Sequence, residues 1–139
     1  MSMIFIDASD HVVGRLASIV ARRLLDGEEI VVVNAEKALI TGDKAAILKE
    51  FAWRMDVGST RKGPFFPKRP DRILHRAIKG MVPNKKARGK TALKRLKVCV
   101  AVPAEYKDKK LERIPEASRV TAESFLTLGE ISTRLGAEF

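Results

Sequence analysis

Features typical of secreted and membrane proteins are scarce in this sequence of 139 residues. The only cysteine is Cys99, which excludes an internal disulfide and fits a reducing compartment. No apolar run reaches the roughly 18–20 residues that a membrane-spanning helix needs. The first seven residues are too short for a secretory signal and lack its basic flank. We therefore expect a cytoplasmic protein without a membrane partner.

Motifs for catalysis and for metal binding are missing as well. The phosphate-binding patterns GxxxxGK[ST] and GxGxxG do not occur. His11, His75 and Cys99 are far apart and lack the spacing of metal ligands. Cys99 lies within an apolar run, which is typical of a core residue. Gly14 either lets a helix pack against a strand or marks a helix N-terminus that binds phosphate. We expect no enzyme, no metal and no cofactor.

The hydrophobic pattern predicts one α/β domain. An unalternating β-branched run at 29–34 indicates a strand covered on both faces, as in a parallel sheet of three or four strands with helices on both sides. Residues 37–41 form either a short strand or a loop, and 104–119 a loop or irregular arm. The other expected strands are 3–7 and 97–102, and the expected helices are 14–25, 43–56, 70–79, 85–96 and 121–135.

Particular residues are expected to fix these elements. Asp10, Asn84 and Thr121 have side chains suited to capping helices that follow them. Ala46, Ile47 and Phe51 fall on one face of the expected helix 43–56, which we expect to face the core.

Acidic residues are almost absent from residues 59–100, where Asp71 is the only one. This segment has a net charge of +13, whereas the whole chain has +10 and the remainder −3. Charges of one sign at this density repel each other unless a polyanion neutralises them. The basic residues, which we expect to face outward and to bind the polyanion, are Arg61, Lys62, Lys68, Arg69, Arg72, Arg76, Lys79, Lys85, Lys86, Arg88, Lys90, Lys94, Arg95 and Lys97.

The composition of this segment favours RNA over other polyanions. A membrane surface calls for a helix with a broad apolar face, which the expected helix 85–96 lacks. A protein that recognises a DNA sequence often uses Asn or Gln side chains to read base edges, and few of them are present here. Gly63, Gly80 and Gly89 would let the backbone approach phosphates, as in recognition of a folded RNA by its shape. Phe65 and Phe66 either stack on unpaired bases or anchor their loop to the core.

Three segments resemble one known family. Residues 69–98, RPDRILHRAIKGMVPNKKARGKTALKRLKV, are similar to the signature of universal family thirteen of the large-ribosomal-subunit proteins. The opening segment 7–36, DASDHVVGRLASIVARRLLDGEEIVVVNAE, and the loop 61–66, RKGPFF, are similar to the same family. The short length and residues 63–83, GPFFPKRPDRILHRAIKGMVP, resemble its archaeal or eukaryotic branch, and the brief C-terminal extension favours the archaeal one.

The resemblance implies a three-layer α/β/α fold around a four-stranded parallel sheet. It implies a structural constituent of the large ribosomal subunit, active in translation, whose partners are large-subunit rRNA and neighbouring ribosomal proteins. His11 and Arg15 match a further family motif and join the expected RNA contacts. We expect a monomer when the protein is free. The alternatives are a regulator that binds an mRNA and an enzyme that acts on RNA or a nucleotide.

Overall fold

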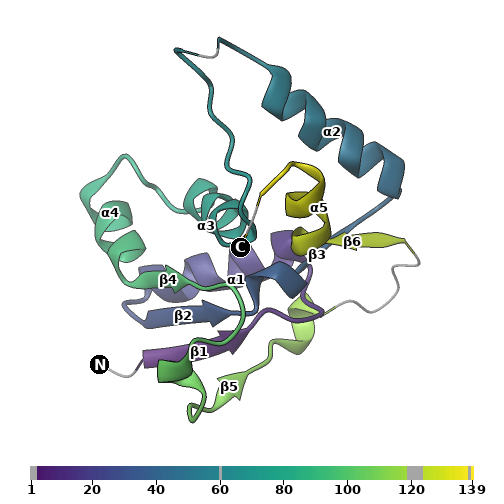
Figure 1. The fold of residues 1–139 in the computed structure, drawn as a ribbon. Coiled ribbons are helices and arrows are strands. Elements are labelled where there is room, and N and C mark those ends of the chain that lie inside the picture. The colour runs from purple at the N-terminus through teal and green to yellow at the C-terminus, as the bar shows by residue number, and fades with distance from the viewer. Residues whose placement is uncertain (1–2, 60, 119–123, 138) are drawn as a thin grey trace.

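The computed structural model describes residues 3–59, 61–118, 124–137 and 139. Helices and strands alternate along the first half of the chain, and short 3-10 turns join several of them (Figure 1). The elements in chain order are β1 (Met3–Asp7), α1 (Val13–Leu25), β2 (Glu29–Val33), η1 (Ala35–Lys37), β3 (Leu39–Thr41), α2 (Lys44–Asp56), α3 (Pro70–Gly80), α4 (Ala87–Lys94), β4 (Leu96–Val98), η2 (Ala104–Tyr106), β5 (Leu111–Glu112), η3 (Pro115–Ala117), β6 (Phe125–Thr127) and α5 (Leu128–Arg134).

The main sheet has four parallel strands in the order β4-β2-β1-β5. Phe5 of β1 pairs with Val31 of β2 on one side and with Leu111 of β5 on the other. All four residues from Ile30 to Val33 are buried, as the unalternating run predicted. The α/β class and the four-stranded parallel sheet are therefore confirmed. The fourth strand, β5, lies in the segment 104–119, which was expected to be a loop or irregular arm. The strand was not predicted because two residues are too few to form a recognisable hydrophobic pattern.

The two faces of the sheet are covered by different parts of the chain. Ile6, Ile30 and Val32 belong to the same core cluster as the buried face of α1. Phe5 and Val31 point to the opposite face, where the Tyr106 ring of η2 lies 5.1 Å from that of Phe5. Figure 1 shows α1 behind the sheet and the η2 turn in front of it. The segment between β4 and β5 is thus the third layer, although the only helix described in it is the 3-10 turn η2.

The C-terminal helix begins later than predicted. Residues Phe125–Thr127 form β6, which pairs antiparallel with β3 in a second small sheet. At the start of α5, Thr127 Oγ1 accepts the N–H of Glu130, and the Glu130 carboxylate accepts the N–H of Thr127. This capping box fixes the helix start, so the predicted helix 121–135 was wrong at its N-terminal end. Thr121, the expected cap, lies outside the described residues.

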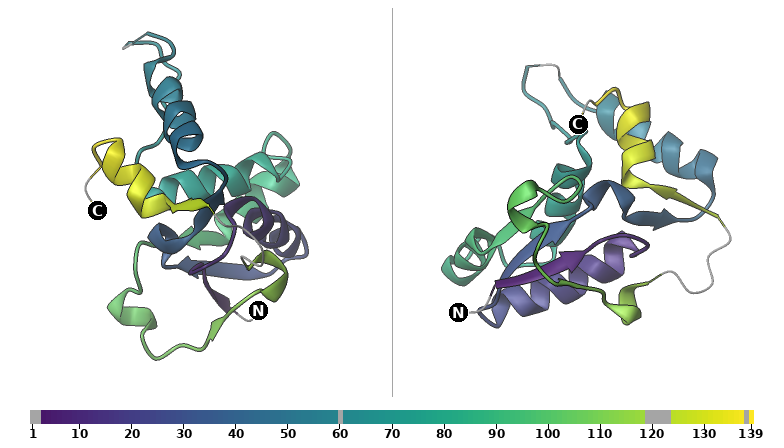
Figure 2. Two further views of the ribbon diagram at one scale, coloured as in Figure 1. Left: turned by 90° about the vertical axis from the view of Figure 1, so that its right-hand side faces the viewer. Right: turned by 60° about the horizontal axis from the view of Figure 1, so that its bottom comes forward.

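Helix α2 stands away from the body of the molecule (Figure 2, left). Its buried residues are Ile47 and Phe51, and Ala46, which was predicted to face the core, is exposed. An inner face was predicted from periodicity, but a helix that projects contacts the core along only part of its length. None of the helices in the described ranges is both long enough and apolar enough to cross a membrane.

Candidate nucleic-acid interface

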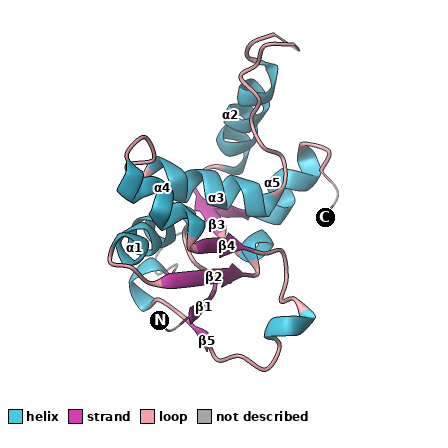
Figure 3. Ribbon diagram, turned by 90° about the vertical axis from the view of Figure 1, so that its left-hand side faces the viewer, coloured by secondary structure: helices cyan, strands magenta, loops and turns pink. Residues whose placement is uncertain are grey.

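Helices α3 and α4 carry six of the fourteen basic residues of the segment 59–100. Figure 3 shows the two helices in one layer beside the sheet. Pro70 occupies the first turn of α3, where its missing N–H costs no hydrogen bond. Ile73, Leu74 and Ile78 are buried in the core, so the basic residues of α3 point outward. Burial of the apolar side of α3 therefore leaves its basic side chains on the exposed side.

Fourteen of the sixteen residues predicted to contact RNA are exposed. Exposure makes these side chains available to phosphates, and their contacts remain a prediction. They are Arg15, Arg61, Lys62, Lys68, Arg69, Arg72, Arg76, Lys79, Lys85, Lys86, Arg88, Lys90, Lys94 and Lys97. Asp71, the single acid of the segment 59–100, lies with its Oδ1 3.4 Å from Nε of Arg69. The two remaining predicted residues, His11 and Arg95, are turned into the protein.

The side chain of His11 is fully buried. Its Nδ1 lies 2.8 Å from the carbonyl oxygen of Ser9, and its Nε2 accepts a 2.9 Å hydrogen bond from the N–H of Ile114. Both ring nitrogens are thus used within the protein, and the predicted RNA contact of His11 was wrong. Neighbouring Arg15 is exposed. A Cβ added at Gly14 would meet no atom within 4 Å, so close packing against a strand does not explain that glycine.

Arg95 was predicted to face outward, and this was wrong. Its Nη2 donates a 2.6 Å hydrogen bond to the carbonyl oxygen of Leu24 in the last turn of α1. A cation is favourable at a helix C-terminus because unpaired carbonyl groups accumulate there. Lys97 remains exposed and donates to the hydroxyl of Tyr106 at 3.2 Å, a bond that raises the pKa of Lys97. Arg95 is a structural residue, whereas Lys97 is available at the surface.

The turn between α3 and α4 is fixed by contacts that the sequence did not reveal. Asn84 does not cap α4, which starts after Lys86; its Nδ2 instead donates to the carbonyl oxygen of Lys79 at 3.1 Å. Gly89 is buried, and a Cβ there would lie 1.9 Å from the carbonyl oxygen of Pro83. Gly89 is therefore required for packing between α4 and the turn, not for approach to a phosphate as predicted. Gly80, by contrast, is exposed, with no atom within 4 Å of an added Cβ.

A groove of about 530 Å³ lies beside α3, and His75, Arg76, Lys79 and Asn84 are among its lining residues. Burial lowers the pKa of His75, the charge of Lys79 lowers it further, and Asp71 acts in the opposite direction. His75 therefore resists protonation in the free protein. A polyanion bound in this groove would relieve the repulsion from Lys79. Sequence reasoning missed His75, because a lone histidine on a helix carries no motif.

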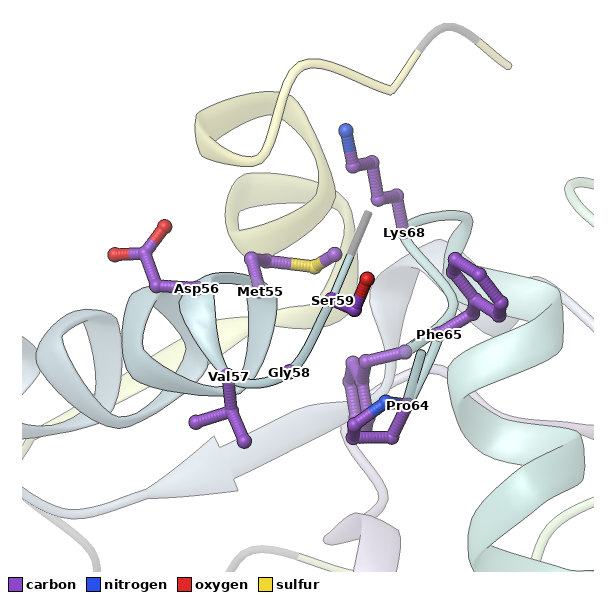
Figure 4. Close-up of a pocket in the computed structure, with 9 residues that line it drawn as sticks. Met55, Asp56, Val57, Gly58, Ser59, Pro64, Phe65 and Lys68 are labelled. Atoms are coloured by element: carbon purple, nitrogen blue, oxygen red, sulfur yellow. The ribbon is translucent and has the colours of Figure 1, made fainter. Parts of the chain in front are cut away.

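The two phenylalanines of the loop after α2 have different surroundings. The ring of Phe66 packs edge-on against Phe51 with 5.7 Å between centroids, so it anchors the loop to the core. Phe65 is 68% exposed and lines a depression of about 470 Å³ together with Met55 and Lys68 (Figure 4). Of the two alternatives given for this pair, the anchor applies to Phe66. Stacking on a base remains open to Phe65.

The described residues do not meet the requirements of a metal site or of a nucleophilic cysteine. Across residues 3–59, 61–118 and 124–137, no group of three or more His, Cys, Asp or Glu residues is placed to hold a metal ion. Cys99 is buried beside Val31 and Val33, and burial raises the pKa of its thiol. A thiol in this state is a poor nucleophile. The prediction that Cys99 is a core residue is confirmed.

An α/β domain that exposes thirteen cations and one paired acid over residues 59–100 belongs to the class of polyanion-binding proteins. The sequence model of the family described as Ribosomal protein L13 matches residues 1–104, and the chain belongs to this family. The large ribosomal subunit protein uL13 of Methanosarcina barkeri is 51% identical over 140 residues, covering 99% of this chain and all of the relative.

Other archaeal relatives are similar over nearly their whole length. The uL13 protein of Picrophilus torridus is 50% identical over 137 residues, covering 99% of each chain. That of Archaeoglobus fulgidus is 48% identical over 134 residues, covering 94% of this chain and 86% of the relative. The resemblance inferred from the three sequence segments, including its archaeal character, is confirmed.

Proposed function

We propose that this chain binds folded large-subunit rRNA through the exposed cations of residues 59–100, as a structural constituent of the large subunit of the cytoplasmic ribosome. Family membership supports the role in the ribosome and in translation, and it supports a protein that is not an enzyme. The observation that carries the RNA-binding surface is the exposure of thirteen cations in a segment whose only acid is already paired with Arg69.

The mechanism is neutralisation of phosphate charge. Lysine and arginine side chains displace counterions from the RNA backbone and let RNA segments pack against the protein. Contacts of this kind position the protein without reading bases, which suits an RNA recognised by its folded shape. The buried residues of α3 and α4 fix the backbone of these two helices, so the six cations on them bind without any ordering of the helix backbone.

The test is the salt dependence of binding to deproteinised large-subunit rRNA. If the protein contacts six to ten phosphates, its affinity falls by about 10³–10⁵-fold between about 50 and 200 mM salt. Lys86→Ala and Arg88→Ala each weaken binding without lowering thermal stability, because both side chains are exposed. Arg134→Ala, an exposed cation on α5 outside the segment, is the matched control and leaves affinity unchanged.

Sedimentation distinguishes the ribosomal role from regulation of an mRNA. A subunit component travels through a sucrose gradient in one-to-one ratio with large subunits, whereas a regulator is found mainly outside them. We expect the first result, together with a monomeric free protein and contacts to neighbouring ribosomal proteins in the subunit. An affinity for rRNA that hardly changes with salt would contradict the proposed surface.

A further inference from the structure

Trp53 is the only tryptophan of the chain, and its side chain is 65% exposed on α2. A single apolar side chain on a surface needs no explanation by itself, but a tryptophan offers a large apolar ring and is enriched at contacts with other molecules. Helix α2 buries Ile47 and Phe51 on its inner side, so burial of Trp53 is not needed to attach the helix. Trp53 is therefore available for contact with a ligand or a partner.

Trp53 borders a groove of about 420 Å³ between α2, the loop after it and α3. This volume is near the lower end of the range for small-molecule sites, about 300–1,000 Å³. Its lining residues are Trp53, Arg54, Val57, Pro64, Phe66 and Arg76, and among these described residues none is acidic. The groove thus combines an aromatic surface with positive charge.

Two guanidinium groups are held in place around the ring of Phe66. Cζ of Arg54 lies 5.1 Å from the Phe66 centroid, and Cζ of Arg76 lies 4.8 Å from it. Nη2 of Arg54 donates to Glu50 at 2.6 Å, and Nη1 of Arg76 donates to the carbonyl oxygen of Phe65 at 3.4 Å. The side chain of Arg54 is nevertheless 38% exposed, so the ion pair with Glu50 does not close it off from a ligand.

The groove adjoins the basic surface of the proposed function. Arg76 lines both the Trp53 groove and the neighbouring groove that contains His75 and Lys79. A nucleic acid bound along α3 therefore passes the opening beside Trp53. An aromatic ring next to fixed guanidinium groups is the combination that binds an unstacked nucleotide, through stacking of its base and pairing of its phosphate.

We propose that this groove holds one unpaired nucleotide of RNA, with its base stacked on Trp53 and its phosphate bound by Arg54 and Arg76. The proposal rests on the proposed function, because it assigns a subsite within the RNA-binding surface. It adds base stacking to a surface otherwise described by charge alone. A protein partner would also cover an exposed tryptophan, but the two arginines favour a phosphate.

The single tryptophan makes the site directly observable. On titration of the full-length protein with deproteinised large-subunit rRNA, we expect the emission of Trp53 to be quenched and its accessibility to acrylamide to fall. A short single-stranded RNA should quench the emission as well, whereas an oligomer of the same charge that lacks bases should not.

Variants test the contribution of the ring. Trp53→Ala should weaken binding of the short RNA by about 5- to 150-fold, as measured by anisotropy of labelled RNA, because base stacking on an aromatic ring contributes that much. Trp53→Phe should retain most of the affinity. Phe139→Ala, which removes another exposed aromatic ring, is the matched control and should have no effect.

The outcomes separate this site from the proposed function. If rRNA binds with its steep salt dependence but Trp53 emission and accessibility do not change, the nucleotide site is wrong and the proposed function stands. If emission changes in assembled large subunits but not with rRNA alone, a protein covers the groove and the assignment is overturned. If rRNA does not bind at all, both proposals fail.

Discussion

Nε2 of His11 accepts a 2.9 Å hydrogen bond from the backbone N–H of Ile114, and this bond joins the loop after β1 to the arm after β5. The same arm is held by Arg113, whose Nη2 donates to the carbonyl oxygen of Ser9 at 2.9 Å. The N–H of Val12 donates to the carbonyl oxygen of Ala117 at 2.8 Å. His11 therefore stabilises the attachment of the arm after β5 to the loop after β1.

His11→Ala should destabilise the protein without changing the RNA affinity of the folded fraction. The substitution leaves the buried N–H of Ile114 without its acceptor, which costs about 1–3 kcal/mol of the free energy of unfolding. Denaturant unfolding measures the loss, and filter binding measures the affinity. Arg15→Ala, on the exposed face nearby, is the control and should change stability by less than about 0.5 kcal/mol. Undiminished stability with loss of RNA binding would restore His11 as a contact residue.

Gly89 and Gly80 should respond in opposite ways to substitution by alanine. In Gly89→Ala the new methyl group collides with the backbone of Pro83, so α4 must shift and stability should fall by about 1–3 kcal/mol. In Gly80→Ala the methyl group meets nothing, and stability should rise by up to about 1 kcal/mol because alanine favours the helix.

Binding measurements complete this comparison. Gly80→Ala should weaken RNA binding despite its higher melting temperature, because the methyl group stands where a phosphate backbone would approach the end of α3. If Gly80→Ala binds RNA as tightly as the unchanged protein, the RNA does not approach at Gly80. If Gly89→Ala melts at the normal temperature, the proposed packing of α4 against Pro83 is wrong.

Local patterns predicted the elements whose signal is long and periodic. The β-branched run that became β2 and the apolar stripes of α1 and α3 identified the central layers. What escaped prediction depends on contacts between distant residues. His11 and Ile114 are 103 positions apart, and Arg95 and Leu24 are 71 apart, so no local pattern reveals that these side chains turn inward. The number of Lys and Arg residues in a segment indicates how basic its surface is, but not which of these side chains forms hydrogen bonds within the protein.

Arg95→Ala and Lys94→Ala should separate a structural cation from a binding one. Loss of the 2.6 Å bond from Arg95 to Leu24 should lower the free energy of unfolding by about 1.5–3 kcal/mol, the range for bonds made by charged groups. The slope of log affinity against log salt should stay unchanged. Lys94 is exposed, and its removal should keep stability while reducing that slope by about one. Equal changes of slope in the two variants would mean that Arg95 also reaches the RNA.

His75 should give stability and RNA affinity opposite dependences on pH. Burial, followed by the charge of Lys79, lowers the pKa of His75 below its ordinary value of 6.5. The unfolded chain therefore takes up this proton more readily than the folded protein. The contribution of His75 to stability is complete above pH 6.5 and is lost as the pH falls through the lower pKa of the folded state.

The free folded protein favours the neutral imidazole of His75. RNA bound beside His75 and Lys79 should reverse this preference, because a nearby phosphate favours the protonated imidazole. Affinity for large-subunit rRNA should then increase as the pH falls from about 7.5 to about 5.5, over the range in which the free protein becomes less stable. His75→Gln removes the titrating group and should abolish both slopes in this region, while Lys79 keeps its charge. Parallel measurements of unfolding and of rRNA binding across this range test the prediction. If His75→Gln retains the pH dependence of binding, the phosphates do not lie over this part of α3.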